Sequence, residues 1–347
     1  MPAQTLFAPR RRASTPRASV SRRRRWHSRA LLSLAFLLAL AVLYRPLPHP
    51  DVSLPGACAA LQAKFAPRGR TSRQWAARSA LYARIVRSLE AEGLTGVSGT
   101  GGTQGLAVQS LFSWDDTPGG GLPQPQLRRL RVPVRAVVLP LPLHARAASV
   151  ALSEAAAAVL QPLLTPSGVW LQEPRTIHAS LMHASHHMWE VPASAAQVDA
   201  EAAALRAVLN ATCPLRAVLE RVVVTPGGVI MACWNVAQGG QPQELRGALR
   251  AALPRAPMRQ LVSEPLILHS TLARVLRTPP GGVAILQPAI TALSAQLCGL
   301  EVLFDVAWFV EELDALALAL RGEYRARAMP LACPPAPARG GRLLDRA

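Results

Sequence analysis

Apolar and polar residues between positions 127 and 320 follow the two periods that distinguish strands from helices. Short runs of alternating or adjoining apolar residues predict β-strands, and longer segments with apolar residues three or four apart predict helices. The strands are predicted at residues 134–139, around His178, and at 219–224, 229–234, around His269 and at 302–310. The helices are predicted at residues 147–164, 193–209, 243–253 and 288–297. The two kinds of element therefore alternate in two passes of similar order.

A hairpin interrupts this alternation. The turn-forming residues Thr225 to Gly228 separate two of the predicted strands. A hairpin joins antiparallel strands, so a purely parallel, doubly wound sheet is disfavoured. We therefore predict an α+β body at residues 127–320, built of two related lobes of mainly antiparallel strands with outer helices.

The segments outside this body differ from it in composition. A stem at residues 45–126 contains Gly- and Pro-rich linkers and one amphipathic helix, predicted at residues 71–92. Residues 321–347 are rich in Arg and Pro and are predicted to form a disordered basic tail. Residues 1–29 form a second basic tail, which precedes an uncharged segment at 30–44.

The uncharged segment could anchor the chain in a membrane. Ala30 to Tyr44 follow a cluster of arginines, and as a helix they would cover roughly 22 Å of a hydrocarbon core of about 30 Å. The positive-inside bias then predicts a single-pass type II signal anchor, with residues 1–29 in the cytosol and the body in the secretory pathway, in the ER or Golgi. The sequon at Asn210 predicts glycosylation there.

Two other interpretations of the amino-terminal segment stay open. Ala39-Leu40-Ala41 resembles the cleavage site of a secretory signal peptide. The first 50 residues, which contain Arg and Ser but no acidic residue, also suit a transit peptide for a plastid or mitochondrion.

The net charge of +18 is concentrated in the tails. Residues 1–50 hold ten Arg and no acidic residue, and residues 321–347 hold six Arg and two acidic residues. The remaining chain has 22 basic and 18 acidic residues, so we expect no strong polyanion binding by the body. The five cysteines show no metal-type spacing, and their odd number leaves at least one outside any intrachain pair.

Two predicted strands carry the same short pattern of residues. His178, Ala179 and Ser180 are followed by an apolar residue, and so are His269, Ser270 and Thr271. Residues i and i+2 of a strand point to the same face, so each copy presents an imidazole beside a hydroxyl. Two copies facing each other would offer two proton-transfer groups and two phosphate ligands, enough to open a cyclic phosphate without a metal.

These tetrapeptides resemble the paired H-x-[ST]-x signatures of the 2H (two-histidine) phosphoesterase superfamily. The surrounding stretches, 178–187 and 266–276, resemble more narrowly the plant-type RNA ligase/cyclic nucleotide phosphodiesterase family, and the resemblance covers roughly residues 127–315. It implies a bilobal fold with a central cleft, and we expect no cofactor. His178 and His269 would be the general acid and base, with Ser180 and Thr271 as phosphate ligands.

The chemistry of histidine supports this interpretation. Because imidazole titrates near pH 6.5, one ring can take a proton from water while the other donates one to the departing ribose oxygen, which predicts a bell-shaped pH–rate profile. We expect a metal-independent cyclic phosphodiesterase acting as a monomer on a 2′,3′-cyclic nucleotide or an RNA-terminal cyclic phosphate. Ligation is an alternative direction for the same site.

Each candidate residue could also have a different role, such as a structural or a metal-binding one. His178 and His269 could be strand histidines with local hydrogen bonds. His183 starts a second H-x-S, and four histidines within residues 178–187 could bind zinc or copper, although no Cys or acid supports them. His183 and Arg274 are possible cleft residues, whereas Arg175 should point to solvent. Trp189, Trp234 and Trp308 could stack on a base but are more typical of a core.

Two other classes of function fit the same sequence. One is a Golgi-type lumenal type II membrane protein with a glycan-modifying or binding role, although no D-x-D metal motif is present. The other is a phosphate- or RNA-binding module of the same fold without turnover.

Overall fold

The computed structural model describes residues 58, 64–65, 70–98, 106–114, 121–141, 146–164 and 168–334. All of these belong to one compact unit, Val52–Ala347. The predicted basic tail at 1–29 and the uncharged segment at 30–44 lie outside the described residues.

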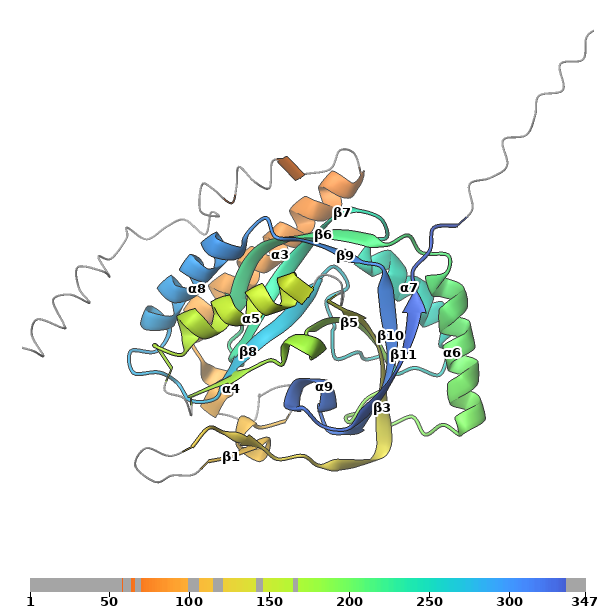
Figure 1. Ribbon diagram of the computed structural model, residues 1–347, viewed down its shortest axis with the longest axis horizontal. Helices are drawn as coiled ribbons and strands as arrows, with labels where there is room; N and C mark the ends of the chain where they lie inside the picture. The colour runs from red at the N-terminus through yellow and green to blue at the C-terminus, as the bar shows by residue number, and fades with distance from the viewer. Residues whose placement is uncertain are drawn as a thin grey trace, which may run out of the picture. The chain divides into compact units, whose positions relative to one another are not determined.

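Two antiparallel sheets form the framework (Figure 1). The first sheet has the order β11-β10-β3-β5 and consists of β3 (Arg129–Pro140), β5 (His178–Ser185), β10 (Val306–Asp314) and β11 (Tyr324–Pro330). The second sheet has the order β4-β8-β7-β6-β9 and consists of β4 (Val169–Leu171), β6 (Leu215–Val224), β7 (Val229–Gln238), β8 (His269–Val275) and β9 (Glu301–Phe304). A small pair, β1 (Phe112–Ser113) and β2 (Gln124–Pro125), lies apart. The predicted α+β body of two mainly antiparallel lobes is confirmed.

The order of strands along the chain does not fill one sheet and then the other, because the chain crosses between the two sheets several times. β4 precedes β5 in sequence but pairs with β8 in the second sheet. The single strand predicted at 302–310 is two strands, because the chain leaves the second sheet at β9 and joins the first at β10, on either side of Asp305. An unbroken apolar run cannot reveal this change of sheet, since both halves have the same pattern.

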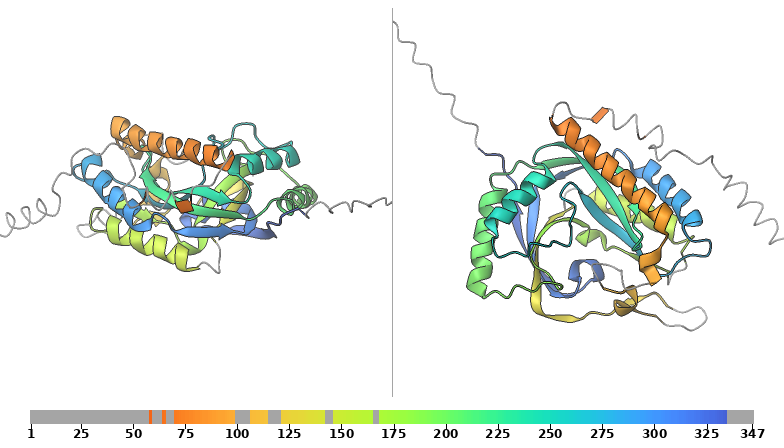
Figure 2. Two further views of the ribbon diagram at one scale, coloured as in Figure 1. Left: turned by 90° about the horizontal axis from the view of Figure 1, so that it is seen from above. Right: turned by 180° about the vertical axis from the view of Figure 1, so that it is seen from behind.

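Helices cover both faces of the second sheet (Figure 2). α3 (Arg70–Glu92) packs on β6 and β7 from one side, while α5 (Arg146–Leu160) and α8 (Val283–Leu297) pack from the other. α6 (Ala195–Leu209) and α7 (Pro242–Ala252) pack together and contact β11 and β5 of the first sheet. The short helical segments are α4 (Thr95–Ser98), η1 (Val108–Ser110), η4 (Pro174–Thr176) and α9 (Ala317–Leu320).

The alternation along β7 shows how the core is divided. Ala232 and Trp234 point into the main core, where the Trp234 ring lies 6.2 Å from that of Phe304. Met231 and Cys233 point to the opposite face and pack with residues of α3. Because β7 is apolar on both faces, other elements must pack against it on both sides to keep these side chains from water.

The structure moves both predicted boundaries of the body. α3, expected in the stem, is integral to the fold: the buried Arg78 donates to Asn235 Oδ1 (3.1 Å), Gln241 Oε1 (2.9 Å) and the Leu266 carbonyl oxygen (2.9 Å). At the other end, the predicted disordered tail begins with β11, which pairs along β10. The stem prediction failed because amphipathicity alone does not reveal what covers the apolar face.

Two disulfides tie distant parts of the chain together. Cys58 pairs with Cys298 and Cys213 with Cys333, while Cys233 is a buried free thiol. The odd cysteine count had indicated at least one such thiol, whereas the spacing did not indicate the pairs.

The predicted location in the membrane of the secretory pathway is corrected by the structure. Among the residues that the structure describes, no helix is both long enough and apolar enough to cross a bilayer. α3 has sufficient length, at 23 residues, but it carries arginine and glutamate along its course. Residues 30–44, on which the anchor was predicted, and the signal and transit peptide alternatives fall outside the described residues.

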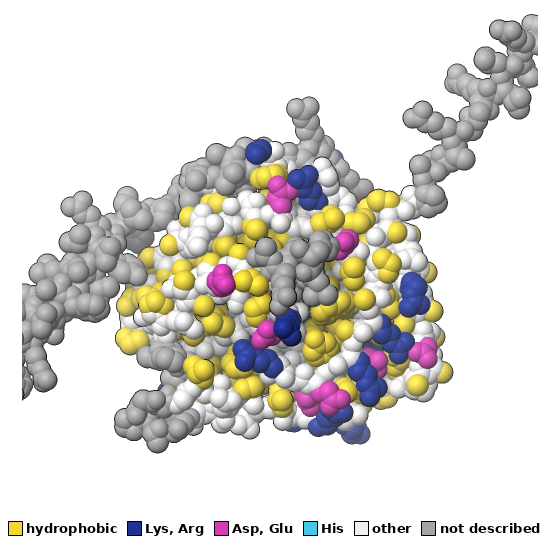
Figure 3. Space-filling model, in the orientation of Figure 1, with side chains coloured by type: hydrophobic (Ala, Val, Ile, Leu, Met, Phe, Trp, Pro, Cys, Tyr) yellow, Lys and Arg dark blue, Asp and Glu magenta, His cyan; other side chains and the backbone are white. Residues whose placement is uncertain are grey.

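Basic and acidic side chains lie interspersed at the lower right of the face in Figure 3. Ion pairs of this kind join Arg129 to Glu323 (2.6 Å) and Arg131 to Glu190 (3.1 Å). Such pairing agrees with a nearly neutral body, and weak polyanion binding stays a prediction.

Candidate active site

A cavity of about 430 Å³ lies where β5 and β8 come together. Six of its lining residues come from these two strands: His178, Ser180, His183, His269, Thr271 and Arg274. The structure therefore brings together every candidate catalytic, phosphate-binding and cleft residue predicted from the sequence.

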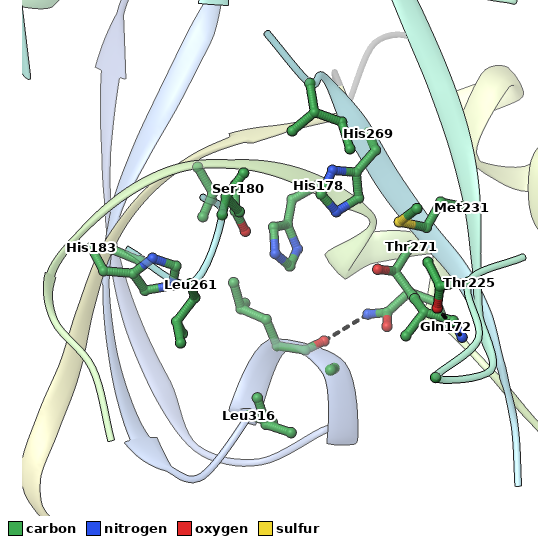
Figure 4. Close-up of a pocket in the computed structure, with 18 of the residues that line it drawn as sticks. Gln172, His178, Ser180, His183, Thr225, Met231, Leu261, His269, Thr271 and Leu316 are labelled. Atoms are coloured by element: carbon green, nitrogen blue, oxygen red, sulfur yellow. Dashed lines mark hydrogen bonds between the residues drawn. The ribbon is translucent and has the colours of Figure 1, made fainter. Parts of the chain in front are cut away.

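The alternation of β5 and β8 places the motif residues in the cavity. His178 and Ser180 line it, whereas the intervening Ala179 is fully buried in the core. On β8, His269 and Thr271 line the cavity while Ser270 is fully buried and accepts a hydrogen bond from Trp234 Nε1 (3.1 Å). Figure 4 shows the two imidazole rings close together, from different strands.

A β-bulge follows each motif and adds a third residue to the cavity. On β5, Ser180 pairs with Val138 and Met182 with Val137, so Leu181 is the extra residue. On β8, Thr271 pairs with Met231 and Ala273 with Ile230, so Leu272 is the extra residue. An extra residue reverses the alternation beyond it. This reversal explains why His183 and Arg274, each five positions after a motif histidine, face the same cavity as the motifs.

The ring of His178 has a defined orientation. Its Nδ1–H donates to the Thr176 carbonyl oxygen (2.7 Å), so in the neutral ring Nε2 carries the lone pair. Burial lowers the pKa of His178, the Thr176 hydrogen bond opposes that shift, and the positive charge of Arg274 lowers the pKa further. The neutral imidazole of His178 is thereby favoured near neutrality.

His269 is held neutral more strongly. Burial, the charge of Arg246 and the neighbouring His178 together lower the pKa of His269 to about 4. Its Nδ1 is buried and has no hydrogen-bond partner among the described residues. An anion in the cavity would oppose these effects and stabilise a proton on one of the two rings.

Three donors accompany the imidazoles. The hydroxyls of Ser180 and Thr271 and the guanidinium of Arg274 line the cavity. Burial lowers the pKa of Arg274 to about 10, so the guanidinium stays charged near neutrality. Arg274 is close enough to His178 to lower its pKa, which brings this positive charge to the motif residues. Arg175, by contrast, is exposed, as predicted from its odd offset.

Of the remaining histidines of the cluster, only one lines the cavity. His183 reaches the cavity, but His186 donates from Nε2 to the Arg259 carbonyl oxygen (2.9 Å), and neither His186 nor His187 lines the cavity. Burial and the neighbouring histidines lower the pKa of His183 to about 3. Within the described ranges, no three His, Cys, Asp or Glu side chains gather closely enough to hold a metal ion.

Arg246 of α7 was not found by sequence reasoning. It donates to the carbonyl oxygens of Ser180 (3.0 Å) and Leu181 (3.0 Å) on β5 and of Pro265 (2.6 Å) and Ile267 (2.8 Å) just before β8. One guanidinium thus connects the backbones of both motif segments. Its only sequence signal is a position in a predicted helix, which Arg250 shares.

Other candidates lie away from the cavity. Trp234 is fully buried, Trp189 is 61% exposed and Trp308 is partly buried, and none of the three lines the cavity. Asn210 is the exposed C-cap of α6, so its glycosylation stays a prediction.

Two lobes that each give one H-x-[ST] strand to a shared cavity are the arrangement that the family resemblance implied. The fold is 2H phosphoesterase-like. No protein-family model and no curated protein matches this chain.

Several solved structures are similar to it. TT0787 of Thermus thermophilus is 21% identical, with a TM-score of 0.41, over 58% of this chain and 99% of that one. LigT of E. coli, crystallised with ATP, is 17% identical, with a TM-score of 0.34, over 58% and 99%. A protein described as a phosphoesterase is 16% identical, with a TM-score of 0.33, over 59% and 96%.

Proposed function

We propose that this chain is a metal-independent phosphoesterase that hydrolyses a cyclic phosphodiester, namely a 2′,3′-cyclic nucleotide or the cyclic phosphate at an RNA end. The convergence of His178 and His269 on one cavity, each with a hydroxyl two residues further along its strand, carries this proposal. A cavity of about 430 Å³ has the size of a small-molecule site.

The reaction needs one base, one acid and donors for the phosphate oxygens. One imidazole takes a proton from water as the water oxygen bonds to phosphorus. The other imidazole gives its proton to the ribose oxygen as the bond from phosphorus to that oxygen breaks, which leaves a phosphomonoester and a free hydroxyl. The Ser180 and Thr271 hydroxyls and the Arg274 guanidinium would stabilise the charge on the non-bridging oxygens.

The low pKa values of the two histidines constrain this scheme. With the pKa of His269 near 4 and that of His178 also lowered, both rings are neutral at pH 7 before an anion binds. On binding, the substrate's negative charge would raise the pKa of one ring. That ring would then take up the proton that it donates as the acid. His178, whose Nδ1–H is engaged by Thr176, presents Nε2 as the acceptor and suits the role of base at the start of the reaction.

The test uses the chain from residue 52 to 347 with EDTA present. We expect hydrolysis of 2′,3′-cyclic nucleotides, and a loss of at least 10³-fold in kcat for His178→Ala and for His269→Ala, since acid–base catalysis contributes roughly 10²–10⁴-fold per group. His187→Ala is the matched control, because His187 belongs to the same histidine cluster but does not line the cavity.

Retained turnover in His269→Ala would refute the proposal. Nucleotide binding by the unaltered chain without any product would favour the binding-module interpretation instead. Loss of activity on adding EDTA would contradict metal independence.

A further inference from the structure

A carboxyl group that the proposed reaction does not use lines the cavity. Glu312 on β10 faces it, and its Oε1 accepts a hydrogen bond from the Leu318 backbone N–H (2.8 Å). Among the described residues no ion pair involves Glu312, whereas the adjacent Glu311 lies 3.8 Å from Arg327. Burying a carboxyl group without a cation costs free energy. A carboxyl group in this position is therefore a candidate for binding a ligand.

Gln172 provides a second acceptor at the same end of the cavity. Its Nε2 donates to Thr176 Oγ1 (2.9 Å) and to the Leu318 carbonyl oxygen (2.7 Å). The Thr176 hydroxyl itself donates to the Glu173 backbone carbonyl oxygen (3.2 Å), so it must accept from Gln172, and this fixes which end of the amide is nitrogen. The Gln172 carbonyl oxygen is therefore the side chain's remaining hydrogen-bonding atom, and it is an acceptor.

Leu318 connects these two acceptors to each other. Its N–H binds Glu312 and its carbonyl oxygen binds Gln172, as the dashed line in Figure 4 shows for Gln172. Gln172 in turn donates from its backbone N–H to the Leu272 carbonyl oxygen (2.9 Å), next to Thr271. The two acceptors thus lie near the Thr271 hydroxyl. The cavity wall around them is otherwise lined by apolar residues, such as Leu316 and Ala319.

We propose that Glu312 and Gln172 bind the base of the substrate and select guanine. This inference rests on the proposed function and deepens it. Guanine presents two adjacent donors, N1–H and the N2 amino group, to a carboxylate that can accept both. Adenine and cytosine place one donor beside an acceptor, and uracil places one donor between two acceptors. The apolar side chains around Glu312 would contact the faces of the base.

The environment of Glu312 agrees with this assignment. Burial raises the pKa of its carboxyl to about 7, against a smaller opposing effect of the Leu318 hydrogen bond. Near neutrality the ionised and neutral forms are therefore both populated. A ligand that donates two hydrogen bonds favours the ionised form, because hydrogen bonds to a charged acceptor are stronger than those to a neutral one.

The experiment compares kcat/KM for the 2′,3′-cyclic phosphates of guanosine, adenosine, cytidine and uridine, together with a base-free ribose 2′,3′-cyclic phosphate. We expect guanosine to be preferred by at least tenfold. Glu312→Gln keeps an acceptor for Leu318 but turns half of the carboxylate into a donor. It should lower kcat/KM for guanosine roughly tenfold to hundredfold, raise that for adenosine relative to guanosine, and leave the base-free substrate unchanged.

Glu311→Gln is the matched control, because it makes the same change one residue away, where the side chain pairs with Arg327. It should preserve the preference for guanosine, and melting temperatures of both variants would establish that each is folded. Turnover of the cyclic nucleotides without base preference, or an unchanged preference in Glu312→Gln, would overturn this inference alone. Absence of turnover on all five substrates would overturn the proposed function, and this inference with it.

Discussion

Arg246 donates from Nη2 to the carbonyl oxygen of Ser180 over 3.0 Å, although the two residues belong to α7 and β5. The same side chain donates from Nη1 to Ile267, two residues before His269. One partly buried guanidinium therefore connects the backbone segments that carry both motif histidines. Burial lowers the pKa of Arg246 to about 10, so it remains charged near neutrality and its charge contributes to the low pKa of His269.

Replacing Arg246 should separate the two motifs without removing a reacting group. For Arg246→Met we expect kcat to fall about 10²-fold with a smaller change in KM, because a displacement of about 1 Å costs that much in oriented reactions. Removing the charge should also raise the pKa of His269 and move the pH–rate profile upward. Steady-state kinetics across pH would measure both effects.

Arg250→Met is the matched control for this prediction. Arg250 lies one turn later on α7 and also donates to two carbonyl oxygens, those of Ala256 (2.8 Å) and Pro257 (2.7 Å), but neither belongs to a motif segment. It should lower the melting temperature with little effect on kcat. Equal kinetic losses in both variants would show that Arg246 acts on stability alone.

The pH dependence of kcat/KM should differ from that of kcat. Because kcat/KM reports the free enzyme, its optimum should lie below pH 6.5, between the lowered pKa values of His269, near 4, and His178. Above this optimum the pair of histidines carries no proton for the acid to donate, so kcat/KM falls. Bound substrate carries a negative charge that raises these pKa values, so the basic limb of kcat should lie at higher pH. A kcat/KM optimum above pH 7 would contradict the assignment.

His183 should make the fold sensitive to acid. Its pKa of about 3 in the folded chain lies below the unfolded value near 6.5, so between these values the unfolded chain binds more protons. The free energy of unfolding is unaffected above pH 6.5 and decreases as the pH falls, by about 2 kcal/mol at pH 5 from this residue. His183→Phe should reduce the difference in urea-unfolding free energy between pH 7 and pH 5.

His187→Phe serves as the comparison for that measurement, since His187 lies outside the cavity and is less buried. An identical pH dependence for His183→Phe and the unaltered chain would mean that His183 is protonated in the folded state at pH 5.

Reduction of the disulfides should destabilise the body. Cys58–Cys298 and Cys213–Cys333 close loops with sequence separations of 240 and 120, and each bridge should contribute roughly 2–4 kcal/mol, chiefly by restricting the unfolded chain. We expect dithiothreitol to lower the melting temperature of the unaltered chain and to have no effect on a variant with these four cysteines changed to Ser. Five reactive thiols in the denatured, unreduced chain would disprove the pairing.

The fragment of residues 127–320 should not fold alone. Removing α3 exposes the Met231 and Cys233 face of β7 and leaves Asn235 without Arg78. Removing β11 exposes the edge of β10. Residues 52–347 should unfold cooperatively in urea, whereas the shorter fragment should show no cooperative transition. A sharp transition in the fragment would show that α3 and β11 are dispensable.

Much of the site was predictable from the sequence because side-chain alternation along a strand is a local property of the backbone. An imidazole at position i and a hydroxyl at i+2 must share a face, so His178 with Ser180, and His269 with Thr271, could be paired before any fold was known. The hairpin at Thr225 to Gly228 could be predicted for the same kind of reason, because turn-forming residues act on their immediate neighbours.

Other features required the tertiary structure. The bulges at Leu181 and Leu272 bring His183 and Arg274 into the cavity, yet neither position carries a glycine or another residue that would indicate a bulge. A bulge depends on the register with the neighbouring strand, which is set by packing across the whole sheet. The contacts of Arg246 with Leu181 and Ser180 likewise join residues 65 and 66 positions apart. The sequence by itself determined which side chains share a strand face, and long-range packing decided which faces meet.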